Sequence, residues 1–182
     1  MRAAVRLALC GVALAGLASC AKPAAGPGAV AERPSGVPQR DFARAVALQA
    51  RGQHLESVAF FRSAAGADPE NGGLHLELGK ALHNASIQMD FSGRGVRYVV
   101  ARSQDRARLR HESLAELERA IELAPDPGAR AFALYTRSRL LDQSGDVAAA
   151  LASVDSALAL MPGERVLHET RARLDGRLRP RH

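Results

Sequence analysis

The sequence predicts an all-helical protein, and two observations support this class. Three stretches share one layout, in which apolar residues recur at helical spacing and a proline closes the run; they are 57–69, 113–125 and 150–162. This spacing puts the apolar residues on one face of a helix. Composition agrees, because tryptophan is absent, aromatic residues make up only 4% and alanine is abundant, which favours close-packed helices over sheets.

Length and composition predict one folded domain behind an N-terminal leader. The chain has 182 residues, of which 47% are hydrophobic and 24% charged. A chain of this kind can form a core of its own, and its apolar content argues against general disorder.

Residues 1–19 are predicted to be a signal peptide. Two arginines precede an apolar run at 7–17 that is too short to span a bilayer comfortably. Residues 17–20 read Leu-Ala-Ser-Cys, which resembles the lipobox of bacterial lipoproteins. The resemblance implies that Cys20 is acylated and becomes the first residue of the mature chain. The alternative is an ordinary secretory signal peptide with a chance cysteine.

The lipobox resemblance has consequences for cysteine chemistry and location. Cys10 would leave with the signal peptide, so the mature chain would keep no thiol for a disulfide or a metal site. By resemblance to sorted lipoproteins, Ala21 after the acylated cysteine implies an outer-membrane anchor, and we expect the protein to face the periplasm. Residues 20–38 are rich in Pro, Ala and Gly and are predicted to be a flexible tether.

The folded part is predicted to span residues 39–178. Asp41 is expected to cap a first helix that runs through Leu48, and Gly52 supplies a turn before a second helix at 54–66. These two helices would form one antiparallel pair.

The second pair begins with a helix that contains Leu78, Gly79 and Leu82, and its partner is the stretch 113–125. Glycine inside a helix costs about 1 kcal/mol relative to alanine, so Gly79 needs a structural reason. The pattern therefore predicts that a neighbouring helix approaches closely at Gly79.

The third pair has a first helix through Leu134 and Leu141 and a second helix at 150–162. Gly145 and Asp146 are predicted to form the turn and the helix cap between them. A last helix at about 164–178 has a polar far side typical of a capping element, and 179–182 is a tail.

Helix, turn, helix and proline thus recur three times, and residues 39–178 resemble the tetratricopeptide repeat family. Leu78-Gly79 followed by Leu82 matches the L-G-x-x-Y core of that repeat, with Leu in place of Tyr. The resemblance implies a short right-handed solenoid of three stacked hairpins plus a capping helix, whose first helices line a peptide-binding groove. An unrelated helical hairpin bundle is the alternative.

The resemblance also implies groove positions on the first helix of each pair. These combine apolar side chains with hydrogen-bonding ones, which suits a peptide backbone, although the apolar members could instead pack the stack. The positions are Phe42, Val46, Gln49, Leu76, Lys80, His83, Asn84, Tyr135, Arg139, Asp142 and Gln143.

The second pair contains an insertion at about 86–106. The distance from Pro69 to Pro125 exceeds the roughly 34-residue repeat period by about 22 residues. Alternating apolar and polar residues flank a Ser-Gly-Arg-Gly turn, which predicts a small β-hairpin. A lengthened first helix and a disordered loop are the alternative. Partner contacts in the insertion are predicted at Arg94, Arg97, Tyr98 and Arg102.

The charges and motifs point to binding and not to catalysis. Arginines are concentrated at 94–110, where they could contact anionic lipid, lipopolysaccharide or an acidic partner, or form a solvated face. Nucleic acid is disfavoured, since the protein is predicted to be exported and no aromatic platform accompanies the arginines. The six histidines lack metal-ligand spacing, and phosphate-loop and nucleophile-elbow motifs are missing. We therefore predict no enzyme activity, catalytic residue, metal or cofactor.

Together these features predict a membrane-anchored adaptor or assembly scaffold that binds a protein or peptide partner in the cell envelope. The alternative is a structural module that associates with peptidoglycan or anionic glycolipid through the arginine-rich insertion. The sequence leaves the partner's identity and the oligomeric state open.

Overall fold

The computed structural model describes residues 33–90, 97–100 and 102–179. The predicted signal peptide, the predicted lipidation site Cys20 and most of the predicted tether lie outside the described residues, as does Arg94. The residues from Arg33 onward form one compact unit.

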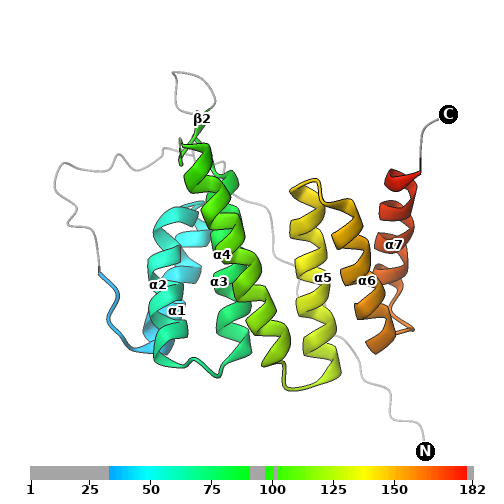
Figure 1. Ribbon diagram of the computed structural model, residues 1–182. Coiled ribbons are helices and arrows are strands. Elements are labelled where there is room, and N and C mark those ends of the chain that lie inside the picture. The colour runs from blue at the N-terminus through cyan, green and yellow to red at the C-terminus, as the bar shows by residue number, and fades with distance from the viewer. Residues whose placement is uncertain (1–32, 91–96, 101, 180–182) are drawn as a thin grey trace, which may run out of the picture. The chain divides into compact units, whose positions relative to one another are not determined.

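The described residues are helical apart from two very short strands, so the predicted all-α class is confirmed (Figure 1). In chain order the helices are α1 (Pro38–Ala50), α2 (His54–Ala67), α3 (Gly72–Ile87), α4 (Ser103–Glu122), α5 (Pro127–Gln143), α6 (Val147–Leu160) and α7 (Arg165–Leu178). The most extensive packing is within the pairs α1 with α2, α3 with α4, and α5 with α6. Further contacts join α2 to α3, α4 to α5 and α6 to α7. Each helix therefore packs mainly on its neighbours in sequence.

Turn chemistry explains where the hairpins reverse. Gly52 and Gly145 have φ angles of 73° and 89°, a left-handed conformation that glycine adopts without steric penalty. Asp146 caps α6, since its carboxylate accepts a hydrogen bond from the Ala149 backbone N–H at 3.1 Å. The turns predicted at Gly52 and at Gly145-Asp146 are thus confirmed.

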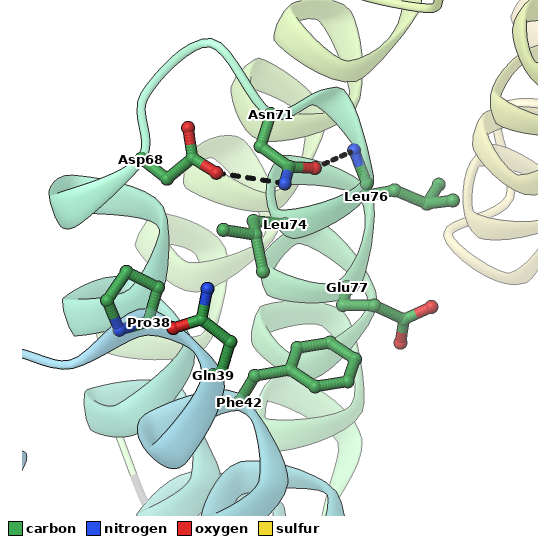
Figure 2. Close-up of a pocket in the computed structure, with 9 residues that line it drawn as sticks. Pro38, Gln39, Phe42, Asp68, Asn71, Leu74, Leu76 and Glu77 are labelled. Carbon is green, nitrogen blue, oxygen red and sulfur yellow. Dashed lines mark hydrogen bonds between the residues drawn. The ribbon is translucent and has the colours of Figure 1, made fainter.

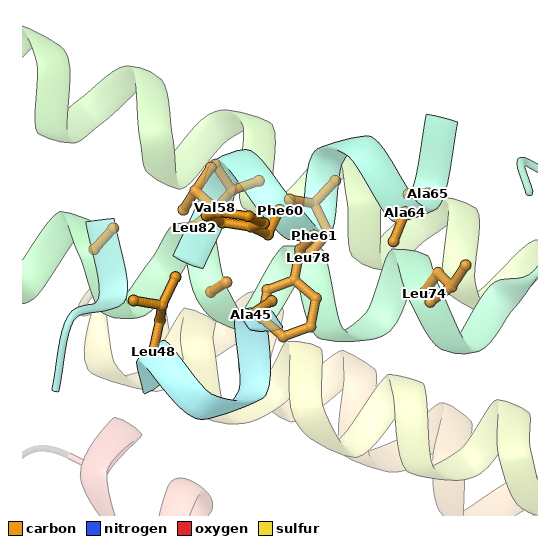
Figure 3. Packing of buried hydrophobic residues seen from close by; sticks show 12 residues of the cluster. Ala45, Leu48, Val58, Phe60, Phe61, Ala64, Ala65, Leu74, Leu78 and Leu82 are labelled. Atoms are coloured by element: carbon orange, nitrogen blue, oxygen red, sulfur yellow. The ribbon is translucent and has the colours of Figure 1, made fainter. Parts of the chain in front are cut away.

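The first apolar core lies among α1, α2 and α3 (Figure 3). Phe61 is fully buried there, and its ring meets the Phe42 ring edge-on, with a centroid distance of 5.7 Å and an interplanar angle of 74°. Burying one such aromatic side chain stabilises a fold by about 1.5–3 kcal/mol. Phe42 therefore has a packing role in α1.

The second apolar core lies among α5, α6 and α7, where Val154 and Leu174 are fully buried. Helix α4 contributes to both cores. Leu109 packs against the first cluster, whereas Leu114 and Ile121 pack against the second. Because α4 is long enough to contact both, it joins the hairpins before and after it.

Helices α3 and α4 approach closely at Gly79. A Cβ atom at this position would lie 3.0 Å from Leu117 Cγ and 3.1 Å from the Ser113 backbone oxygen. The Ser113 hydroxyl also donates a 2.7 Å hydrogen bond to the Gly79 carbonyl. The close approach predicted from a glycine inside a helix is confirmed, and its reason is this contact.

The insertion predicted at 86–106 is helical at both ends. Helix α3 continues through Ile87, and its last turn includes the buried residues Ala85 and Ser86. Helix α4 begins at Ser103. Between them β1 (Met89–Asp90) pairs antiparallel with β2 (Arg97–Tyr98). Residues 91–96 lie outside the described residues, so a hairpin larger than this pair stays a prediction.

Spanning a bilayer requires a long and apolar helix, and the described part of the chain contains no helix that meets both conditions.

Asp41 differs from the prediction that it caps α1. The helix begins at Pro38, so Asp41 belongs to its first turn and does not precede it. The buried Asp41 carboxylate is directed toward the residues before the helix. It accepts hydrogen bonds from the Ser35 N–H at 2.8 Å, the Ser35 hydroxyl at 2.7 Å, the Gly36 N–H at 2.9 Å and the Ser63 hydroxyl at 2.7 Å. One carboxylate therefore holds the segment before α1 against α1 and α2.

These contacts perturb the acidity of Asp41. Burial alone would raise the pKa of its carboxyl, but the hydrogen bonds from Ser35, Ser63 and Gly36 favour the ionised form and lower the pKa from 3.8 to about 2. A group whose pKa falls on folding stabilises the protein above its unfolded-state pKa. That contribution is lost as the pH drops from about 3.8 to about 2.

We predict that Asp41→Asn lowers the urea midpoint at pH 7, because the amide nitrogen cannot accept the hydrogen bonds that the carboxylate accepts. The gap between the variant and the wild type should narrow as the pH falls from 4 to 2. Urea titrations at several pH values measure this gap. Glu169→Gln, which removes an exposed carboxylate of α7, is the control and should stay near wild type throughout. A gap for Asp41→Asn that is unchanged by pH would contradict the assignment.

Candidate functional site

The groove positions predicted on α1 differ in exposure. Val46 is 43% exposed, Gln49 is half-buried, and Phe42 is half-buried against Phe61. Of the three, Phe42 also lines a pocket.

The positions predicted on α3 divide between surface and interior. Leu76, Lys80 and Asn84 are half-buried, and the Lys80 ammonium donates to Glu77 at 2.7 Å one turn away. His83, by contrast, is 3% exposed. Its burial removes it from the surface that a ligand could reach, which corrects its assignment to an open groove.

His83 instead connects two hairpins. Its Nε2 atom lies 2.6 Å from Gln143 Oε1 of α5. Burial lowers the pKa of His83; the hydrogen bond with Gln143 acts in the opposite direction, and the nearby Arg110 charge lowers the pKa further. A neutral imidazole that donates to the Gln143 oxygen fits this environment, so both residues serve the contact between α3 and α5.

Among the α5 positions, Asp142 is also engaged within the protein. Its carboxylate pairs with Arg173 at 2.6 Å and with Arg177, both from α7. Asp142 therefore attaches the last helix, and its predicted ligand contact stays a prediction. Tyr135 is half-buried, and the Arg139 guanidinium lies 5.9 Å from the centroid of its ring.

Two of the predicted positions, Phe42 and Leu76, come together in one pocket of about 480 Å³ where α1 and α3 begin (Figure 2). We call it the α1–α3 pocket. Its apolar wall and polar edge are formed by Pro38, Gln39, Phe42, Asp68, Asn71, Gly73, Leu74, Leu76 and Glu77.

The polar edge of the α1–α3 pocket is held in place by local hydrogen bonds. Asn71 caps α3 by accepting from the Gly73 N–H at 3.1 Å, and its side-chain amide donates to Asp68 at 3.0 Å. Glu77 is half-buried beside Leu76. The pocket thus combines an apolar interior with two carboxylates, from Asp68 and Glu77, at its edge.

Sequence reasoning missed most of this pocket. Leu74 was available as the first apolar residue of α3, and Asn71 before two glycines is a recognisable helix start. Gln39 and Asp68 carry no such signal, because only the packing of α1 against α3 brings them together.

A second pocket of about 290 Å³ lies where α5 and α7 begin, and it contains Tyr135. Phe132 and Val166 beside it are 53% and 40% exposed. Its position is similar to that of the α1–α3 pocket, because each pocket lies where two odd-numbered helices begin.

The positions predicted in the insertion lie next to the strand pair. Tyr98 is 38% exposed in β2, Arg97 pairs through its backbone with Asp90, and Arg102 is the exposed N-cap of α4. Arg94 lies outside the described residues.

No protein-family model matches this chain, and no curated protein matches it at a significant level. Within the described residues, no group of three or more His, Cys, Asp or Glu side chains is arranged to hold a metal ion.

Proposed function

We propose that this protein is a lipid-anchored adaptor of the cell envelope that binds a peptide segment of a partner protein on a stack of tetratricopeptide-like hairpins. The observation that carries the proposal is the α1–α3 pocket, which contains the predicted groove residues Phe42 and Leu76. Its volume of about 480 Å³ is in the range of sites that hold small ligands or a few side chains.

The proposed repeat architecture is supported by the order of packing. Helices pair as α1–α2, α3–α4 and α5–α6, with left-handed glycines in the first and third turns, and α7 follows as a single helix. In such stacks each hairpin buries its apolar face against the next one, and the first helices line a common surface. A right-handed solenoid with α7 as its cap is part of the proposal.

The chemistry of the pocket indicates what kind of peptide it would take. Its wall suits an aliphatic or aromatic side chain, since Pro38, Phe42 and Leu74 supply apolar contact. The Asp68 carboxylate at the edge would favour a neighbouring Lys or Arg, whereas the Glu77 carboxylate already pairs with Lys80. We therefore propose a partner segment in which an apolar residue stands beside a basic one.

The proposed location follows from the lipobox resemblance at residues 17–20. Acylation of Cys20 with diacylglycerol and a further chain such as palmitate would give stable membrane anchoring, because several acyl chains hold a protein where one gives only marginal binding. We propose an outer-membrane anchor with the folded domain facing the periplasm, a protein partner and no nucleic acid.

We predict that Leu76→Arg reduces recovery of the partner at least about tenfold in a crosslinking pull-down from intact cells. In the complex, an apolar residue of the partner would cover the new charge, and desolvating that charge costs several kcal/mol, which exceeds the ~1.4 kcal/mol of a tenfold affinity change. Because Leu76 is half-buried at the surface, the variant should keep the wild-type melting temperature within a few degrees.

The matched control is Phe132→Arg, which introduces the same charge at an exposed apolar position of the second pocket. It should recover the partner as the wild type does, and Leu76→Met should do the same. If folded Leu76→Arg protein still captures the same partner, the α1–α3 pocket is not the binding site.

A further inference from the structure

Exposed apolar side chains gather where α2 begins and α3 ends, beside the strand pair. Leu55 and Ile87 are each 38% exposed, Met89 is 41%, Tyr98 is 38% and Val99 is 40%. We call these five residues the apolar tip. Large apolar side chains that are exposed together, and not singly, mark surfaces that bind something apolar.

The apolar tip is held together by one side chain, Gln88. Its Oε1 atom accepts from the Leu55 N–H at 3.0 Å, and its Nε2 atom donates to the Gly52 carbonyl at 2.8 Å. The Gln88 backbone oxygen accepts from the Val99 N–H at 2.9 Å. Backbone segments far apart in the sequence are thus fixed side by side around Gln88, and these segments carry the five exposed side chains.

Several arginines lie near the apolar tip in sequence, and Arg106 contacts it directly. Arg102 and Arg108 have side chains 86% and 77% exposed, and they share one carboxylate, that of Asp105, at 3.2 and 3.4 Å. The Arg106 guanidinium lies 4.2 Å from the centroid of the Tyr98 ring and donates to the Val100 carbonyl at 2.9 Å. Arg51 is exposed beside Gly52. Near the tip these four arginines outnumber the described carboxylates, which are the exposed Glu56 beside Leu55 and Asp105.

We infer that the apolar tip docks shallowly on a bilayer surface that contains anionic lipid. Aliphatic side chains, a tyrosine and arginines are the residues that a membrane interface accommodates, because the apolar parts enter the acyl boundary while the charged groups stay among the headgroups. Anionic lipids attract clustered arginines, and this attraction falls off within a Debye length. The complementary charge favours lipid over an uncharged apolar partner.

The chain length before the folded domain allows this contact. Fully extended, the stretch from Cys20 to Arg33 reaches at most about 45 Å, so a domain anchored at Cys20 stays within reach of the bilayer. The inference goes beyond the proposed peptide binding, since the apolar tip and the α1–α3 pocket share no residue. Docking at the tip would hold the domain in one orientation on the membrane.

The absence of tryptophan makes a direct test possible. Tyr98→Trp places a single fluorescent reporter in the apolar tip, and Phe132→Trp places one at an exposed position of α5. The full chain carrying Cys20→Ser, which lacks the proposed lipid anchor, is mixed with an excess of phosphatidylglycerol–phosphatidylcholine vesicles that carry brominated acyl chains, so that docking does not depend on that anchor. We expect a blue shift and strong quenching of the indole fluorescence in Tyr98→Trp and neither effect in Phe132→Trp.

The contribution of charge is tested separately. Vesicles of phosphatidylcholine alone, high salt, or the further changes Arg102→Glu and Arg108→Glu should each reduce quenching in Tyr98→Trp severalfold. Equal quenching of both reporters, or unchanged quenching in neutral vesicles, would overturn the inference. No quenching in any vesicle would also overturn it and would leave the apolar tip as a surface for a protein. None of these outcomes bears on the Leu76→Arg pull-down, so the two proposals fail independently.

Discussion

Gly79→Val is expected to lower the melting temperature by roughly 2–12 °C. The added Cβ would lie 3.0 Å from Leu117 Cγ and 3.1 Å from a backbone oxygen of α4, and a backbone atom cannot move aside as a flexible side chain can. Overpacking of this kind typically costs about 1–3 kcal/mol, and each kcal/mol shifts the midpoint by about 2–4 °C in a domain of about this size. Thermal unfolding followed by circular dichroism measures the effect.

Gly66→Val is the matched control, since Gly66 is an exposed helical glycine of α2 with open space around its Cβ position. Valine is the better helix former of the two, so this variant should match the wild type or melt slightly higher. If both variants gave the same melting temperature, the close contact between α3 and α4 would be wrong.

Cys20→Ser is expected to abolish lipid attachment altogether. Serine lacks the thiol that forms the thioether to diacylglycerol, so the variant should incorporate no labelled palmitate and should remain unprocessed or appear in the soluble fraction. Fractionation after a high-salt wash measures retention, because the wash weakens electrostatic binding through the arginines near the apolar tip.

Cys10→Ser serves as the control for this experiment, as it removes the other cysteine of the chain from within the apolar run. It should be processed, labelled and retained like the wild type. Retention of Cys20→Ser in salt-washed membranes at the wild-type level would rule out the anchor at Cys20 and, with it, the proposed outer-membrane attachment.

The Gly79 contact and the two proposed binding surfaces share no residue, whereas Asp41 stands in α1 between the pocket residues Gln39 and Phe42. Asp41 holds the start of the domain and Gly79 joins α3 to α4, whereas Leu76 lies in the α1–α3 pocket and Tyr98 in the apolar tip. Unfolding and binding can therefore be measured separately. A variant that loses the partner at an unchanged melting temperature reports on the pocket alone.

Local patterns in the sequence were sufficient for the helical class and for several particular residues. Apolar spacing predicted α2, α6 and α7 to within a few residues, and Gly52 and Gly145 marked turns that require a left-handed backbone. Gly79 indicated a close helix contact, since a glycine inside a helix otherwise only destabilises it. Each of these signals can be read from residues a few positions apart in the sequence, because helix periodicity and turn conformation depend on neighbouring residues.

Contacts between distant residues were decided by the tertiary structure alone. Burial against α5 made His83, a candidate ligand contact in the sequence, a partner of Gln143, 60 residues later, and α7 engaged Asp142 through Arg173, 31 residues away. Gln88 joined the turn after α1 to the end of β2. A polar residue on a helix face looks the same in sequence whether water or another helix covers it. Only the packing of one helix on the next determines which polar groups are buried and paired and which remain open to a ligand.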